Sequence, residues 1–294
     1  MSESPAWTHL VRFSHKGVPT FAQLVNPKED GDLEEKFEVE IAQGDPVFNN
    51  IKLTNEKVTV TRSTLLAPFA TVPIVINTGL NYKDHVTESL FYSSPDLMPN
   101  IPYIFFRPAT SLAPPYPALL RTYKVQQECL DYEGELVFQT GSRPLKDISV
   151  EEAKKHIVGF TAGCDFSPRP GKILGRMNYI FSKAFDDWTP VGPVLVHPSV
   201  VGVLPELDLT TKWNGKMVQS DNTRNMIFNC AQILSSMSTG TTVQPGTVVF
   251  SGTCGGGAWF ISEGKAGTGV NDGDEIEVEI KKIGKVRAYP CFDK

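Results

Sequence analysis

Residues 130–138 constrain this chain more than any other stretch, because they place three carboxylates in a run of strand-forming residues. The stretch reads Leu-Asp-Tyr-Glu-Gly-Glu-Leu-Val-Phe. Side chains two apart on a strand share a face, so the pattern predicts one strand with Asp131, Glu133 and Glu135 on the same side. Three like charges in a row repel one another unless solvent or a cation neutralises them. The stretch alone favours a divalent metal site and an exposed acidic face about equally.

A further carboxylate shifts this balance towards the metal. Asp165 directly follows a second apolar run, residues 157–164. Carboxylates in two separate strand-like stretches can supply the hard oxygen ligands that suit a divalent cation. We therefore favour the metal site over the exposed face.

Several motifs in order resemble the fumarylacetoacetate hydrolase family. The order and spacing make the resemblance specific, and it covers roughly residues 75 to 288. It is carried by residues 131–136, Asp165, residues 182–186, 190–193, 214–219, 222–223 and 251–253. In that family the ligands of one Mg²⁺ or Mn²⁺ would by position be Glu133, Glu135 and Asp165, with Ca²⁺ as an alternative ion.

The fold class expected is mainly β (α+β), because short strand-like stretches outnumber helical ones. Residues 8–26 indicate a hairpin, residues 150–156 and 226–234 have helical spacing, and residues 275–280 alternate like a half-exposed strand. The resemblance implies a mixed β-roll or β-sandwich catalytic domain, expected over residues 71–294. It also implies a small N-terminal β domain, expected over residues 1–70, and assembly as a homodimer.

Composition excludes several classes of function. A net charge of −5 argues against nucleic acid or an anionic membrane as the main partner, since both need a basic face. No apolar run approaches the roughly 18 residues that span a bilayer. The five cysteines are scattered without CxxC spacing, which indicates reduced thiols. We expect a cytoplasmic protein whose partner is a small anionic molecule.

His85 and Glu88 are the candidate acid–base pair. They stand three residues apart where residues 81–88 are expected to begin a helix, so both side chains fall on one face. Such a pair is more often a surface contact. The resemblance raises the catalytic interpretation, because in the family this segment belongs to a mobile lid that supplies the acid–base dyad.

Two cations are candidates for the same site. Arg169 is expected either to meet a substrate carboxylate or to neutralise the acidic cluster. Lys183 stands in an apolar frame, which is unusual for a surface lysine and favours a role at the site. The alternative for Lys183 is an ion pair with Asp186 or Asp187.

Thr253 and Lys172 complete the expected site. The glycines around Thr253, in residues 252–257, allow backbone amides to approach a substrate oxygen, although a permissive turn explains them too. Lys172 stands where family members commonly have Gln. A cation there favours a second anionic group on the substrate, whereas the alternative is a solvated loop residue.

The function expected is a metal-dependent hydrolase that cleaves a C–C bond in a β-diketo acid or acylpyruvate. The resemblance leaves decarboxylation or keto–enol isomerisation of oxaloacetate-like or hydroxydienoic acids as the alternative. A metal-bound binding protein without activity is a third hypothesis. All three call for a small anionic oxo acid as the partner.

Overall fold

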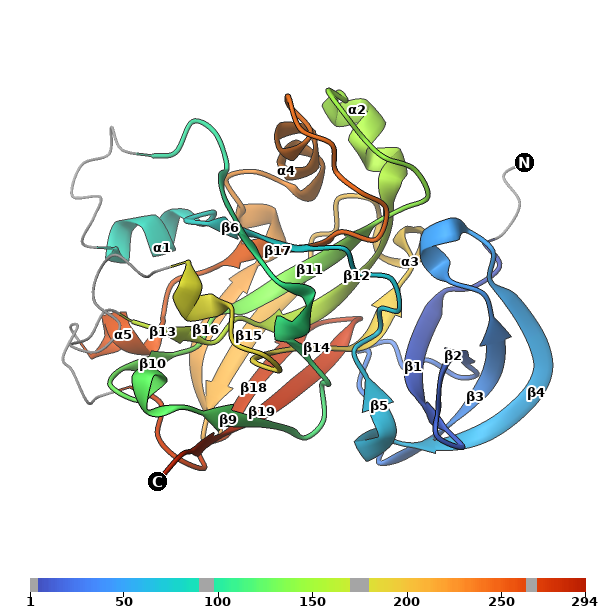
Figure 1. Ribbon diagram of the computed structural model, residues 1–294, viewed down its shortest axis with the longest axis horizontal. Helices are drawn as coiled ribbons and strands as arrows, with labels where there is room; N and C mark the ends of the chain where they lie inside the picture. The colour runs from blue at the N-terminus through green and yellow to red at the C-terminus, as the bar shows by residue number, and fades with distance from the viewer. Residues whose placement is uncertain (1–4, 90–97, 170–179, 263–268) are drawn as a thin grey trace.

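A computed structural model describes residues 5–89, 98–169, 180–262 and 269–294 of the chain (Figure 1). Strands dominate and the helices are short, which confirms the mainly β fold class. No helix among the described residues is long and apolar enough to cross a membrane. All five cysteines are free, in agreement with the expectation of reduced thiols.

The larger sheet has twelve strands. In spatial order its main path consists of β4 (Lys52–Thr61), β3 (Lys36–Gln43), β2 (Val18–Leu24), β1 (His9–His15), β14 (Thr189–Val196), β12 (Ile157–Cys164), β11 (Gly134–Thr140), β17 (Val248–Thr253), β6 (Val75–Gly79) and β7 (Tyr103–Arg107). Two short strands lie off this path, β5 (Leu65–Leu66) beside β1 and β8 (Leu112–Ala113) beside β14. The central strands β11, β12 and β14 have almost wholly buried side chains, so they form the core that positions the acidic cluster.

The smaller sheet has five strands and packs against the centre of the larger one. Its strands, in spatial order, are β16 (Lys216–Asn222), β15 (Asp208–Trp213), β18 (Ile276–Ile280), β19 (Gly284–Phe292) and β9 (Ala118–Thr122). Tyr132, Phe166 and Val278 are buried in the apolar cluster that includes both layers. A separate two-stranded ribbon joins β10 (Leu130–Asp131) to β13 (Ser167–Pro168).

The helices lie around the larger sheet. They are α1 (Lys83–Glu88), α2 (Val150–Ala153), α3 (Pro198–Val201), α4 (Cys230–Met237) and α5 (Ala258–Ile261). Helices α2 and α4 pack against each other, whereas α1 and α5 lie on the side of the molecule away from β1 to β4 (Figure 1).

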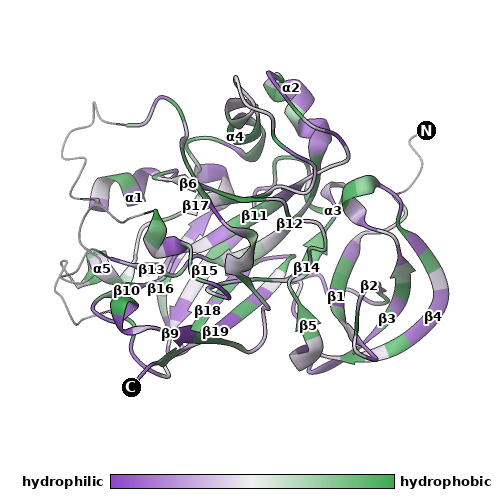
Figure 2. Ribbon diagram, in the orientation of Figure 1, coloured by the Kyte–Doolittle hydropathy of each residue, from purple (hydrophilic) through white to green (hydrophobic). Residues whose placement is uncertain are grey.

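The N-terminal strands β1 to β4 form an antiparallel meander with alternating bands of polar and apolar residues (Figure 2). Strand β1 pairs with β14 through His9 opposite Val196 and Leu10 opposite Leu195, so the meander continues the larger sheet. The expected domain boundary near residue 70 falls between β5 and β6 and stays a prediction.

Three expected elements differ from the structure. Residues 130–138 are not one strand, because β10 and β11 are separated at Tyr132 and Glu133. The Asp131 carboxylate accepts a hydrogen bond from the Tyr132 N–H, and this local bond takes the place of a ladder bond.

The other two differences concern a helix start and a strand's exposure. Helix α4 begins only at Cys230, because Asn229 and Gln232 form a capping box that fixes the start. Strand β18 is mostly buried rather than half exposed, and its Glu277 is paired with Arg287 at 2.6 Å.

Candidate active site

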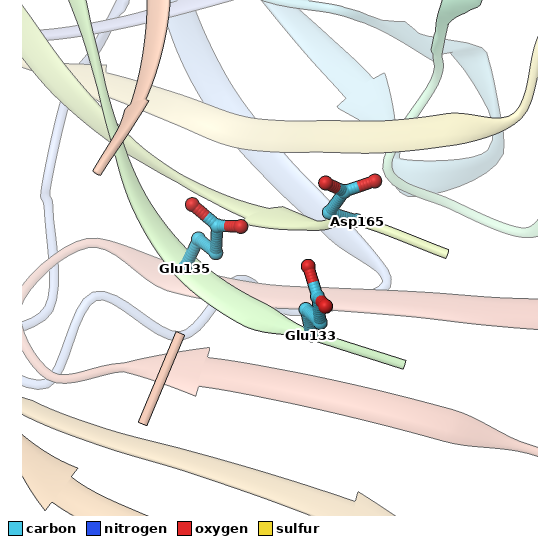
Figure 3. Close-up of side chains that lie close together, drawn as sticks. All are labelled: Glu133, Glu135 and Asp165. Carbon is cyan, nitrogen blue, oxygen red and sulfur yellow. The ribbon is translucent and has the colours of Figure 1, made fainter. Parts of the chain in front are cut away.

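Glu133, Glu135 and Asp165 lie together at adjacent ends of β11 and β12 (Figure 3). The antiparallel register places Gly134 opposite Cys164, and the Asp165 N–H donates to the Glu133 carbonyl at 2.8 Å. One oxygen of each carboxylate lies within 4.8 Å of the others, and all three residues are buried. Neighbouring strands therefore assemble the acidic triad, and the alternative of an exposed acidic face is wrong.

Two predicted cations reach this triad. The Lys183 ammonium, at the end of a 3₁₀ turn (Phe181–Lys183), donates to Glu133 Oε2 at 2.6 Å and Asp165 Oδ2 at 2.8 Å. Arg169 donates to Glu133 Oε1 at 2.7 Å and to Asp131 Oδ2 at 2.7 Å. Both side chains are buried, so they balance the charge of the acidic cluster from inside the protein.

The sequence interpretation missed two further partners of Asp165. Arg107, the last residue of β7, donates to Asp165 Oδ1 at 2.9 Å and is almost fully buried. Asn77 in β6 donates to Asp165 Oδ2 at 2.9 Å. Both residues end or interrupt apolar runs, but only the pairing of β6 with β17 and β7 brings them to the triad.

The two glutamates of the triad have opposite electrostatic environments. Burial disfavours the charged form of Glu133, but Lys183 and Arg169 outweigh it and hold the pKa of this carboxyl well below its usual range. Burial raises the pKa of Glu135, and the charges of Asp165 and Glu133 raise it further. The Gly252 N–H donates a hydrogen bond to Glu135 Oε2, and no side-chain cation like Lys183 or Arg169 is seen to bond this carboxylate within the described residues. Glu135 is therefore the position where a bound cation would relieve the largest repulsion.

The triad fits the divalent metal that the sequence predicted. Three buried carboxylates supply hard oxygen ligands, which Mg²⁺, Mn²⁺ and Ca²⁺ prefer. Hydrogen bonds from Lys183, Arg169, Arg107 and Asn77 orient the carboxylates without using all of their lone pairs. The residues that would hold the ion are Glu133, Glu135 and Asp165.

The predicted acid–base pair is formed in α1. His85 Nδ1 lies 2.8 Å from Glu88 Oε1, and His85 is 6% exposed. Glu88 Oε2 accepts from the Gly256 N–H at 2.9 Å, so both oxygens of this carboxylate are engaged. The rings of His85 and of Phe260 in α5 pack in a T-shaped arrangement with their centroids 5.4 Å apart. This packing fixes the imidazole, and its Nε2 is the nitrogen that does not face Glu88.

The glycine loop, which runs from Gly252 near the end of β17 to Ala258 at the start of α5, binds carboxylates of the protein itself. Its N–H groups at Gly252, Gly256 and Ala258 donate to Glu135, Glu88 and Asp131 respectively. Gly252 has a φ of +94°, and a Cβ there would lie 2.7 Å from the Cβ of Asn81, so the close approach requires glycine. The loop was expected to approach an anion, and the anions are three side chains of this chain.

Thr253 and Lys172 have different outcomes. The Thr253 hydroxyl donates to the Gly134 carbonyl at 3.0 Å and accepts from Gln219 Nε2 at 2.9 Å. Gln219 also accepts from the Gly134 N–H at 3.1 Å, so these residues brace the triad strand. A substrate contact of Thr253 stays a prediction. Lys172 lies outside the described residues.

Comparison with known proteins relates this chain to a family of enzymes. Residues 74–289 match the family model of the fumarylacetoacetate hydrolase C-terminal domain. The human mitochondrial oxaloacetate tautomerase FAHD2B is 33% identical over 226 residues, 76% of this chain and 68% of that protein. The solved fumarylpyruvate hydrolase of Pseudomonas aeruginosa, in complex with Mn²⁺ and pyruvate, is 27% identical with a TM-score of 0.64, covering 77% of this chain and 91% of that one.

A second solved structure extends the likeness over nearly the whole chain. The fumarylacetoacetate hydrolase of psychrophilic Exiguobacterium antarcticum is 21% identical with a TM-score of 0.74, covering 97% of this chain and 100% of that one. At this identity the likeness concerns the fold alone. The family match and the FAHD2B likeness go further, and together they show that this chain belongs to the fumarylacetoacetate hydrolase family.

Proposed function

We propose that the protein is a divalent-metal-dependent enzyme that hydrolyses a C–C bond in an acylpyruvate or related β-diketo acid. The observation that carries this proposal is one glycine loop bonded to both the acidic triad and the His85–Glu88 pair. Because the same loop holds the metal-binding triad and the base, the site suits a reaction that needs a metal and a base together. The Mn²⁺ and pyruvate complex of the related fumarylpyruvate hydrolase supports the same substrate class.

The charge of the cluster suits an anionic substrate. Among the described residues that make it up, the carboxylates Asp131, Glu133, Glu135 and Asp165 exceed the cations Arg107, Arg169 and Lys183 by one unit of charge. A divalent ion would reverse the sign and leave one unit of positive charge. A 2-oxo carboxylate would restore neutrality, which favours its binding in a buried site.

His85 is the base of the proposed reaction. Its bond to Glu88 fixes the proton on Nδ1, so Nε2 accepts a proton from water. The hydroxide adds to the distal carbonyl, and the C–C bond breaks with its electron pair on the pyruvate carbon. That carbon then takes up a proton, which gives pyruvate and a second carboxylic acid. The metal, when bound, supplies Lewis acidity at the 2-oxo acid end.

Lys183 complements this chemistry by holding the ligands. Its ammonium lies between Glu133 and Asp165, with Phe105 at 5.5 Å covering it. A fixed cation in a water-poor site stabilises the negative charge that develops as the bond breaks, because no solvent needs to reorganise around it.

Keto–enol tautomerisation of an oxaloacetate-like acid is the second candidate. It is favoured by sequence relatives such as the human oxaloacetate tautomerases FAHD2A and FAHD2B, 32% and 33% identical to this chain. The same His85 would move a proton between the substrate carbon and oxygen, and no water would be consumed. Decarboxylation of the same acids would use the metal end in a similar way.

A product screen with Mg²⁺ or Mn²⁺ tests these proposals. Acylpyruvates, oxaloacetate and hydroxydienoates are offered to the purified protein, and acids, CO₂ and enol absorbance are followed. Hydrolysis yields two acids, decarboxylation yields CO₂, and tautomerisation changes only the enol signal. Metal binding without turnover of any substrate would contradict the proposed enzyme and favour a binding protein.

A further inference from the structure

Asp131 is fully buried, and hydrogen-bond donors occupy both of its carboxylate oxygens. Oδ1 accepts from the Tyr132 N–H at 2.9 Å and from the Ala258 N–H at 2.5 Å. Oδ2 accepts from Arg169 Nε at 2.7 Å. Asp131 is not one of the three carboxylates of the triad, so a buried charge with this many donors requires another explanation.

The first link runs from Asp131 to the triad through Arg169. The ribbon of β10 and β13 pairs Asp131 with Ser167, and the Arg169 N–H donates to the Cys129 carbonyl at 2.8 Å, which places the arginine beside Asp131. The guanidinium then bridges Asp131 Oδ2 and Glu133 Oε1, both at 2.7 Å. A planar guanidinium held on one carboxylate presents its other nitrogens in a fixed direction. Asp131 thereby sets where Arg169 holds Glu133.

The second link runs from Asp131 to the base through α5. The Ala258 N–H that binds Asp131 belongs to the first residue of α5, which carries Phe260. The Phe260 and His85 rings pack in a T-shaped arrangement with 5.4 Å between centroids, and the Arg169 guanidinium lies 5.5 Å from the centroid of the Phe260 ring. Gly257 permits this approach, because a Cβ there would lie 3.0 Å from Asp131 Oδ2 and 3.2 Å from Phe260.

We propose that Asp131 is a positioning residue that sets the metal ligand Glu133 and the base His85 relative to each other. One carboxylate holds Arg169 against Glu133 and holds α5 so that Phe260 packs on His85. Asp131 acts through these neighbours and is not a metal ligand. The inference rests on the metal site of the proposed function, but it holds whichever reaction follows.

The test compares Asp131→Asn with wild type in metal binding and in turnover. Asparagine keeps the shape and one acceptor oxygen, but it loses the charge and places a donor against Arg169. Outer partners of metal ligands typically contribute about 10–100-fold to metal affinity or activity, so we expect the Mn²⁺ Kd to rise by that factor. We also expect kcat at saturating Mn²⁺ to fall, because the base is displaced, with a smaller change in KM for substrate.

Glu277→Gln is the matched control. Glu277 is also buried and bonded to an arginine, Arg287, at 2.6 Å, but it lies in the smaller sheet and belongs to no part of the site. Both variants remove the charge of a buried carboxylate that is paired with an arginine, so both should unfold at a lower temperature. Only Asp131→Asn should change the Mn²⁺ Kd measured by calorimetry on folded protein.

The double variant Asp131→Asn/Arg169→Lys identifies the route. Arg169→Lys keeps the positive charge but loses the fork that spans two carboxylates, so it should weaken Mn²⁺ binding by itself. If Asp131 acts on Glu133 through Arg169, the double variant binds Mn²⁺ no more weakly than the weaker single variant. Full additivity would overturn the link through Arg169.

The remaining outcomes are decisive as well. If Asp131→Asn does not fold, Arg169→Lys tests the same bridge from its other end, and wild-type Mn²⁺ affinity in that variant overturns the proposal. Wild-type affinity and kcat in folded Asp131→Asn overturn it too. A wild-type protein that binds no Mn²⁺ contradicts the proposed function itself, which separates the two failures.

Discussion

Two histidine–glutamate pairs in this chain have nearly the same nitrogen–oxygen distance and very different surroundings. His85 lies 2.8 Å from Glu88, three residues along α1, and His156 lies 3.0 Å from Glu152, four residues along. Glu152 also accepts from Arg143 at 2.7 Å and from Lys155 at 3.1 Å. The Glu152 carboxylate is thus shared between His156 and the long, exposed side chains of Arg143 and Lys155.

Glu88 instead takes its second bond from a backbone N–H of the loop that also binds Glu135. The loop next to the acidic triad therefore holds the His85–Glu88 pair in place. The His156–Glu152 pair is instead held by neighbouring side chains at the surface. A pair becomes a candidate dyad through what fixes its carboxylate, and not through its spacing or its length.

The largest expected effect comes from removing the charge of Glu135, the triad carboxylate bound by the same loop as Glu88. In Glu135→Gln a ligand is lost, so Mn²⁺ affinity should fall by more than the roughly 10–100-fold of an outer partner, and turnover should vanish. Without metal the same variant should melt at a higher temperature than wild type, because a buried like charge beside Asp165 and Glu133 is removed. Calorimetry and thermal melts with and without Mn²⁺ measure both. Wild-type Mn²⁺ affinity would contradict the ligand assignment.

The second effect compares the two histidines directly. General-base catalysis typically contributes about 10²–10⁴-fold, so His85→Ala should lose that much turnover and keep wild-type Mn²⁺ affinity. His156→Ala, the matched control, should stay within about twofold in turnover. Steady-state kinetics at saturating Mn²⁺ provides the measurement. Equal losses in the two variants would remove the basis for distinguishing the pairs.

The sequence predicted the contents of the site better than its connections. Alternation and the family resemblance singled out Glu133, Glu135 and Asp165, and the structure brings them together. The same alternation made Asp131 look like one more member of the row. Its separate role depends on the pairing of β10 with β13, which lie 36 residues apart and show no local pattern.

The bonds that distinguish the two pairs are also long-range. Gly256 lies 168 positions from Glu88, and Gly252 lies 117 from Glu135, so no local spacing shows that the loop binds the protein's own carboxylates. Arg107 was missed for the same reason, since only its place on β7 brings it to Asp165. Assembly as a homodimer and a cytoplasmic location stay predictions.

The third effect tests whether Glu88 acts through His85. In Glu88→Gln one of its two donors, His85 or the Gly256 N–H, faces an amide NH₂ in place of an oxygen. Turnover should fall, and by no more than in His85→Ala. The double variant His85→Ala/Glu88→Gln should then be no slower than His85→Ala alone, since the two residues act as one unit. A further loss in the double variant would give Glu88 a role of its own.

The smallest effect is expected at the surface pair and concerns stability only. The hydrogen bond from His156 and then that from Lys155 lower the pKa of Glu152 to about 2. A carboxyl whose folded pKa is lowered contributes stability above its unfolded pKa, near 4.5, and loses it as the pH falls towards 2.

Glu152→Gln should therefore lower Tm at pH 6 by no more than about 3 °C, because exposed ion pairs contribute little. The difference from wild type should shrink as the pH is lowered from 4.5 to 2.5, and turnover at pH 7 should not change. Thermal melts of both proteins across that range, with 0.5 M salt as a further condition that screens the pair, measure this difference. A Tm difference that persists at pH 2.5, or a loss of turnover, would show that the surface pair does more than its partly exposed setting predicts.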